Sequence, residues 1–280
     1  IGDNTSKVTK YDNPNRTLTD PYEGQQLGEI WGYVVDGYFK TDEEARNYKV
    51  DQSFVNQMIN ASALDNGLHA GDLKFVDLDG NNKIEQTTSA NDRKDMKVIG
   101  NSLPRYNYNL GISADWYGID FSVLFQGIGK QNWYPGAETS MFWGPYSRPY
   151  ASFIPSDFMS QVWSEENSNA YFPRPRGYVA LGSNRELAVV NTKYLQNLAY
   201  CRLKNLSIGY TLPDKWLSKI GFEKIRVYFS GENLLTFTKL HSDYIDPEQA
   251  SASNSWKTSK SDANIYPWAK TYSFGVDITF

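Results

Sequence analysis

Hydrophobic and polar residues alternate with a period of two along several segments of this chain. The clearest case is the last ten residues, TYSFGVDITF, in which every second residue is apolar. The apolar positions are Tyr272, Phe274, Val276, Ile278 and Phe280. Successive side chains of a β-strand point to opposite faces, so this alternation predicts a strand with one apolar and one polar surface.

Four further segments share the alternation, and they predict strands near residues 105–117, 120–127, 198–212 and 225–235. The first two meet at Tyr117 and Gly118, which predicts a hairpin with a tight turn. The last two are joined by PDKWLSKIGFE, where Pro213 and Gly221 are typical of the start and end of a short helix. The polar faces of these strands carry Asn, Ser, Gly, Asp, Arg and Glu at their centres.

The connections between the predicted strands alternate between short and long. Two are short, whereas residues 130–197 and 236–266 form long excursions. Transmembrane β-barrels have short periplasmic turns and long extracellular loops, and loops of this length are uncommon in compact soluble domains. The pattern therefore favours an all-β fold, a transmembrane antiparallel β-barrel in the bacterial outer membrane, with external loops and a periplasmic C-terminus.

Composition narrows the classes of function. The net charge of −4 gives no basic surface for nucleic acid, so no nucleic-acid partner is expected. Aromatic residues make up 15% of the chain, which suits either an aromatic-rich sandwich or aromatic girdles at two membrane interfaces. The only histidines, His69 and His241, fall in separate predicted loops, and no enzyme is expected.

Five predicted strands are too few for a closed barrel, because bacterial single-chain barrels have even numbers of strands from about 8 upward. We therefore expect residues 105–280 to be the C-terminal strands of a larger barrel. Residues 1–104 are predicted to form an extracellular loop region, in which 28–39 form either a strand or an extended loop segment. Within it, Thr41 and Glu44 form the capping box of a short helix.

Several segments occur in an order that identifies a family. They are GDLKFVDLDGNNKIE, VIGNSLPRYNYNLGISADWYGIDFSVLFQGIG, YLQNLAYCRLKNLSIGYTLP, IRVYFSGENLLTFTKLHSDYIDPE and YPWAKTYSFGVDITF. Over residues 28–280 the chain resembles the C-terminal third of SusC/RagA-type TonB-dependent outer-membrane transporters of Bacteroidetes.

The resemblance implies a 22-stranded barrel with an N-terminal plug that this chain does not include. It also implies import of oligosaccharides or peptides together with a SusD-like surface lipoprotein, energised through TonB. Such transporter–lipoprotein pairs can form dimers. The last strand, with Tyr272, Phe274, Val276, Ile278 and Phe280 facing outer-membrane lipid, resembles the signal that directs barrel assembly.

The segment DLDGNNKIE resembles a calcium loop. Oxygen ligands fall at positions 1, 3, 5, 7 and 9 of the loop, namely Asp77, Asp79, Asn81, the Lys83 carbonyl and Glu85. Asn82 occupies the position at which such loops usually have glycine. Thr88 occupies position 12, where an acidic ligand is usual, so Asp92 is a candidate for the twelfth ligand. The alternative is a turn held by its own side chains, which needs no metal.

The long excursion carries Trp133, Tyr134, Phe142, Trp143 and Tyr146. Such aromatic side chains can stack on sugars or contact a lid protein, and they can equally form the loop's own core. Two functions remain open at this point. One is a nutrient importer of the outer membrane, and the other is a soluble β-sandwich adhesin or glycan-binding module that uses residues 77–85 as a calcium site.

Overall fold

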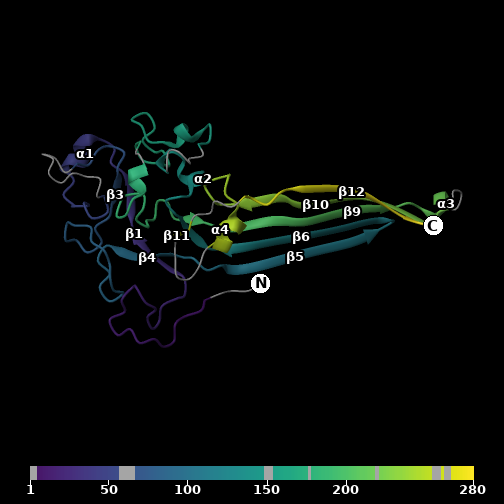
Figure 1. Cartoon of the computed structure of the whole chain (residues 1–280), viewed down its shortest axis with the longest axis horizontal. Coiled ribbons are helices and arrows are strands. Elements are labelled where there is room, and N and C mark those ends of the chain that lie inside the picture. Colours follow the sequence, from purple (N-terminus) through teal and green to yellow (C-terminus); the bar gives the residue numbers. More distant parts are fainter. Residues whose placement is uncertain are drawn as a thin grey trace.

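A long β-sheet projects from a rounded lobe (Figure 1). The structure, a computed structural model, describes residues 5–56, 67–147, 154–175, 178–217, 221–253, 260–261 and 266–280. The C-terminus and α3 (Asp214–Leu217) lie at the tip of the sheet farthest from the lobe. No helix in the described ranges is both long and apolar enough to cross a bilayer.

Five antiparallel strands form the projecting sheet, in the order β12-β10-β9-β6-β5. Their bounds are β5 (Arg105–Trp116), β6 (Ile119–Lys130), β9 (Tyr200–Thr211), β10 (Lys224–Thr238) and β12 (Thr271–Thr279). All five strands predicted from the alternation are present. The sheet is open, so the closed barrel and its strand count are not seen in this chain.

Short connections lie at the tip and long ones in the lobe. At the tip, Tyr117 and Gly118 have φ angles of 48° and 84°. Left-handed angles at both central residues are typical of the two-residue turns that fit the twist of a hairpin. The predicted helix after Pro213 is α3, and Gly221 has a φ of 77°.

The lobe contains short strands and helices. Its strand pairs are β1 (Glu29–Tyr33) with β4 (Met96–Asn101), and β2 (Val35–Tyr38) with β3 (Leu73–Phe75). A third sheet places β7 (Asn132–Pro135) between β8 (Gln196–Asn197) and β11 (Lys260–Ser261). The helices are α1 (Asp42–Asn47), α2 (Ser140–Trp143) and α4 (Pro247–Ser253), with 3₁₀ turns at Gly144–Tyr146, Phe158–Gln161 and Tyr178–Leu181.

The predicted capping box is present at α1. The Thr41 hydroxyl accepts a hydrogen bond from the Glu44 N–H at 3.1 Å. The Glu44 carboxylate in turn accepts from the Lys40 N–H at 2.8 Å, one residue before the usual position. Segment 28–39, for which a strand or an extended loop was expected, contains β1 and β2.

Candidate functional site

The cross-strand register gives the five-stranded sheet two different faces. One row of directly paired residues crosses all five strands as Ala114, Phe121, Ile208, Phe229 and Phe274. The neighbouring row, on the opposite face, consists of Ser113, Ser122, Ser207, Ser230 and Ser273. We call these surfaces the apolar face and the polar face.

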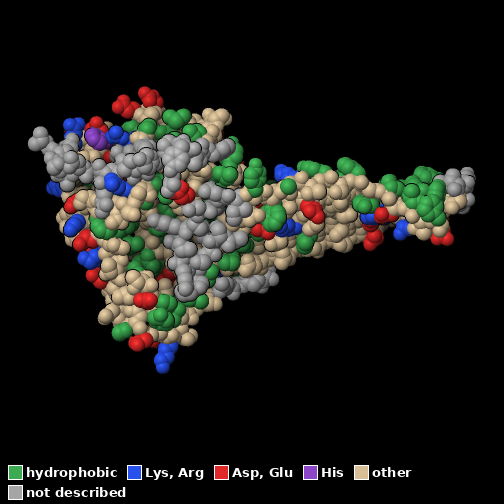
Figure 2. Space-filling model, viewed as in Figure 1, with side chains coloured by type: hydrophobic (Ala, Val, Ile, Leu, Met, Phe, Trp, Pro, Cys, Tyr) green, Lys and Arg blue, Asp and Glu red, His purple; other side chains and the backbone are tan. Residues whose placement is uncertain are grey.

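The apolar face is uncovered over much of its area. Its exposed members include Leu110, Ile112, Trp116, Ile208, Val227, Phe274, Val276 and Ile278. Phe274 is 83% exposed and Phe280 is 81% exposed. Figure 2 shows apolar side chains along the projecting sheet and gathered at its tip, whereas charged side chains are frequent over the lobe. A contiguous exposed apolar surface of this kind indicates contact with a partner or a membrane.

The polar face carries an ion-pair ladder near the tip. The Arg226 guanidinium donates to Asp120 of β6, with its Nε at 2.7 Å from Oδ1 and one terminal nitrogen at 2.9 Å from Oδ2. Its other terminal nitrogen donates to Asp277 of β12 at 3.1 Å. The three residues therefore connect β12, β10 and β6 across the intervening strand β9.

Gly209 makes this ladder possible, because it lies on β9 between the two partners. A Cβ at Gly209 would lie 2.1 Å from an Asp120 carboxylate oxygen and 2.6 Å from the Arg226 Nε. We expect Gly209→Ala to break the pair and to lower the free energy of unfolding by roughly 1–3 kcal/mol. Gly111→Ala is the matched control, because the nearest atom to its Cβ is at 3.9 Å. Equal effects of the two substitutions in denaturant titrations would contradict this interpretation.

At the lobe end, the polar face is covered by the connection that follows β10. Arg202 of β9 is 2% exposed and donates to both Asp246 carboxylate oxygens at 2.7 Å. It also donates to Glu248 at 2.7 Å, and Lys204 donates to the same carboxylate at 2.9 Å. A buried, bidentate hydrogen bond between charged groups strongly restricts the relative positions of the two segments that it joins. It holds the start of α4 against the sheet.

The aromatic residues proposed as contacts for substrate or partner lie inside the lobe. Trp133, Tyr134, Trp143 and Tyr146 are all at most 1% exposed. Hydrogen bonds satisfy their polar atoms: the Trp143 indole donates to the Gly136 carbonyl at 3.0 Å, and the Tyr146 hydroxyl donates to the Pro173 carbonyl at 2.7 Å. Phe142 packs edge-on against Trp143. As described, these side chains build the core of the excursion and present no surface to a ligand.

The calcium-like loop forms a compact turn. Asp77 accepts hydrogen bonds from the backbone N–H groups of Gly80 and Asn82, both at 2.7 Å. Although partial burial opposes the effect, these bonds lower the pKa of Asp77. Asn82 has a φ of 61°, so it adopts the left-handed conformation that glycine usually supplies.

The carboxylate that joins the loop is Asp95. Oxygens of Asp77, Asp79 and Asp95 lie within 4.8 Å of one another. Asp95 is fully buried and accepts from the N–H groups of Leu78 at 2.8 Å and Glu85 at 2.7 Å, and its burial raises its pKa. Asp92, the predicted twelfth ligand, instead belongs to a separate turn, in which its N–H donates to the Ser89 carbonyl.

The Glu85 side chain faces the rim of the loop. It accepts from Lys94 at 3.2 Å and from the Asn81 amide at 3.0 Å. Asn81 also accepts from the Lys83 N–H at 2.8 Å, so the loop positions expected to hold a metal are partly engaged with one another. The three converging aspartates remain the part of the loop suited to a cation.

Sequence reasoning did not single out Arg202, Asp246, Arg226, Asp120 or Asp95. A signal existed for two of them, since Asp120 and Arg226 are opposite charges on the polar parity of their strands. An arginine and an aspartate on one face of a sheet are expected to pair. No comparable local signal points to Arg202 and Asp246, which are 44 residues apart.

Taken together, the structure defines a class: an antiparallel sheet that is bare and apolar on one side and polar, with internal ion pairs, on the other. Comparisons with known proteins point to membrane receptors and transporters, whose barrels contain sheets of this kind. The chain is 28% identical over 264 residues to the TonB-dependent receptor P3 of Formosa agariphila, and 25% identical over 283 residues to the receptor P39 of the same organism. Each match covers 92% of this chain. No protein-family model matches the chain.

Solved structures show the same fold. The RagAB peptide importer in its open-open state aligns with a TM-score of 0.56 and 20% identity, covering 96% of this chain. Its closed-closed state aligns with a TM-score of 0.52 and 21% identity, covering 98% of this chain. The chain spans 22% of P3, 25% of P39 and 24% of the open-open chain. The predicted resemblance to the C-terminal part of TonB-dependent transporters is confirmed.

Proposed function

We propose that this chain is the C-terminal part of an outer-membrane β-barrel importer, with the apolar face in contact with lipid and the polar face lining an aqueous interior. One observation carries the proposal. A row of apolar residues and a row of serines cross the same five strands on opposite faces, and Ala114, Ile208 and Phe274 of the apolar row are exposed. A soluble sandwich would cover that apolar row with a second sheet.

Aromatic residues at both ends of β5 support the membrane assignment. Tyr106 and Tyr108 lie near the lobe, and Trp116 and Tyr117 lie at the tip. Aromatic girdles at both interfaces flank the lipid-facing band of such barrels. In this proposal the lobe is external, the tip with α3 is periplasmic, and Tyr272, Phe274, Val276, Ile278 and Phe280 serve membrane assembly.

The cargo and partners are part of the same proposal. The structural neighbours are named as peptide importers, and the sequence relatives as TonB-dependent receptors. We infer import of a peptide or an oligosaccharide, powered through TonB by segments outside this chain, with a SusD-like lipoprotein over the lobe. The 22-stranded closure and the dimer of such pairs belong to this inference.

Uptake tests the function. Cells that express the full-length protein should take up fluorescently labelled oligosaccharide or peptide digests, and deletion of TonB should abolish this uptake. The purified protein should require detergent and should migrate faster on gels before heating than after it. Release of the protein into salt buffer without detergent would instead support the soluble adhesin or glycan-binding module.

We also propose that residues 77–95 bind calcium through Asp77, Asp79 and Asp95. Three carboxylates that lie within 4.8 Å of one another repel without a cation, and oxygen ligands suit calcium. Asp79→Asn should weaken calcium binding by at least about tenfold, because it removes one ligand charge. Terbium luminescence or titration calorimetry on the full-length protein measures this affinity.

Asp92→Asn is the matched control for calcium binding, since it removes a nearby carboxylate that lies outside the cluster. Calcium should also raise the melting temperature of the wild type, because a ligand that binds only the folded state stabilises it. Equal losses for the two variants, or no calcium-dependent shift, would leave only a turn held by its own hydrogen bonds.

A further inference from the structure

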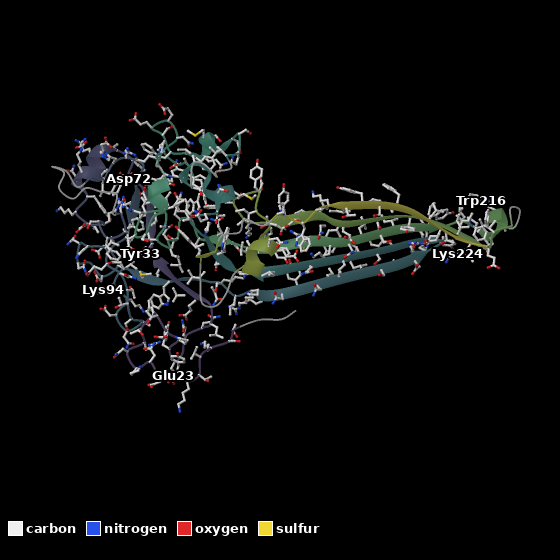
Figure 3. The ribbon with its side chains drawn as sticks, in the orientation of Figure 1. Glu23, Tyr33, Asp72, Lys94, Trp216 and Lys224 are labelled. Carbon is white, nitrogen blue, oxygen red and sulfur yellow. The ribbon has the colours of Figure 1, made fainter. Side chains whose placement is uncertain are left out.

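A cavity of about 360 Å³ lies between the segment before β1 and the β1–β4 pair. Figure 3 labels Glu23 and Lys94, which directly follow the lining residues Tyr22 and Arg93 in the sequence. Its polar and aromatic lining consists of Arg16, Tyr22, Glu29, Trp31, Arg93 and Lys97. The volume falls within the range typical of small-ligand pockets.

The lining has an excess of positive charge. It contains three cations and a single carboxylate, Glu29. Both oxygens of that carboxylate already accept hydrogen bonds, one from the Tyr22 hydroxyl at 2.6 Å and the other from the Gln26 N–H at 2.9 Å. Arg93 and Lys97 form no salt bridge with any residue that the structure describes. The cavity is therefore electrostatically suited to an anion.

Two N–H donors in the lining are buried and form no hydrogen bond of good geometry with the described residues. They are the Nε of Arg16 and the Nε1 of the Trp31 indole, whose interaction with the Tyr22 hydroxyl falls short of such a bond. A buried donor without a partner costs roughly 1–3 kcal/mol, so native proteins seldom retain one without a reason. Two such donors around one cavity with excess positive charge indicate a missing acceptor that carries negative charge.

We propose that this cavity binds a carboxylate group on the molecule that the transporter imports. The inference rests on the proposed function, which places the lobe outside the cell, where cargo arrives. The Arg16 guanidinium, which also stacks on the Tyr22 ring at 4.7 Å, and the Trp31 indole donate to the anionic oxygens. Arg93 and Lys97 supply the compensating charge.

Binding to the full-length transporter in detergent tests the proposal with two matched pairs of probes. One pair is trigalacturonate and its neutral methyl ester, and the other is the tripeptide of glutamate and that of glutamine. We expect one charged probe to bind more tightly than its neutral twin. The pair that shows the preference identifies the source of the anion as a saccharide or a peptide.

Trp31→Phe keeps an aromatic side chain, although a smaller one, and removes the N–H donor. The substitution should lower the affinity for the charged probe about tenfold or more, because a hydrogen bond to a charged group is lost. The affinity for the neutral probe should not change. Trp216→Phe, a change in an exposed residue at the tip, is the matched control.

A double variant, Arg93→Gln with Lys97→Gln, changes only exposed side chains and should also abolish the charge preference. A wild type that does not prefer either charged probe, or a preference that survives both variants, overturns the proposal. Uptake in cells reports separately on the importer. Import of the neutral and the charged probe alike would reject this cavity as an anion site and would leave the importer assignment standing.

Discussion

Replacing Ile112 with arginine should destabilise the membrane-inserted protein by roughly 2–4 kcal/mol, whereas replacing its neighbour Ser113 with arginine should change stability little. Ile112 is 49% exposed on the apolar face, between the aromatic residues that mark the two ends of β5. It therefore lies near the proposed bilayer midplane, where a lipid-facing charge is most costly. Ser113 lies on the polar face opposite Ser122, where water solvates an added charge.

Denaturant unfolding of the full-length protein in lipid vesicles measures both variants. The two variants place the same arginine side chain at adjacent residues of one strand, on opposite faces of the sheet. The pair thus isolates the environment of the face from the propensity of the strand. Comparable losses for the two variants would show that neither face contacts lipid.

Replacing Arg202 with methionine should cost roughly 3–5 kcal/mol, because it leaves the buried Asp246 carboxylate without its cation. The connection after β10 should then detach from the sheet, and limited proteolysis should cut between residues 239 and 253. Arg226→Met is the comparison, because that arginine is 23% exposed and water can solvate the partners it leaves. Its effect should be about 1 kcal/mol.

A second substitution separates the lost ion pair from lost packing. Asp246→Leu in the Arg202→Met background removes the unpaired carboxylate and should restore much of the stability, since breaking a buried pair costs more than replacing both partners. Protection from protease should return with it. If the double variant is no more stable than Arg202→Met alone, the ion pair is not what holds the connection to the sheet.

The sequence predicted the strands and their faces because a period of two is a local property. Ile112 and Ser113 are assigned to opposite faces by parity alone, and the register confirms the assignment. Gly209 could not be interpreted in this way. Its role depends on Asp120 and Arg226, which become neighbours only when β6, β9 and β10 align.

The long connections were the least predictable part of the chain. From the sequence alone, their aromatic residues could form either a binding surface or a core. Burial of the side chains decides between the two, and it depends on the path that the connection takes through the lobe. Asp95 was missed for a related reason. The spacing of a calcium loop favoured Asp92, whereas the fold brings Asp95, which lies farther along the chain, to the loop.

Site-directed spin labelling along β5 tests the central claim most directly. With the native cysteines of the full-length protein, Cys201 among them, replaced by serine, single cysteines at positions 109–114 carry a nitroxide in vesicles. We predict high collision rates with oxygen, which dissolves in lipid, at 110, 112 and 114, and high rates with a water-soluble nickel chelate at 109, 111 and 113. Collision rates without this alternation, or apolar positions shielded from both reagents, would contradict a lipid-facing sheet.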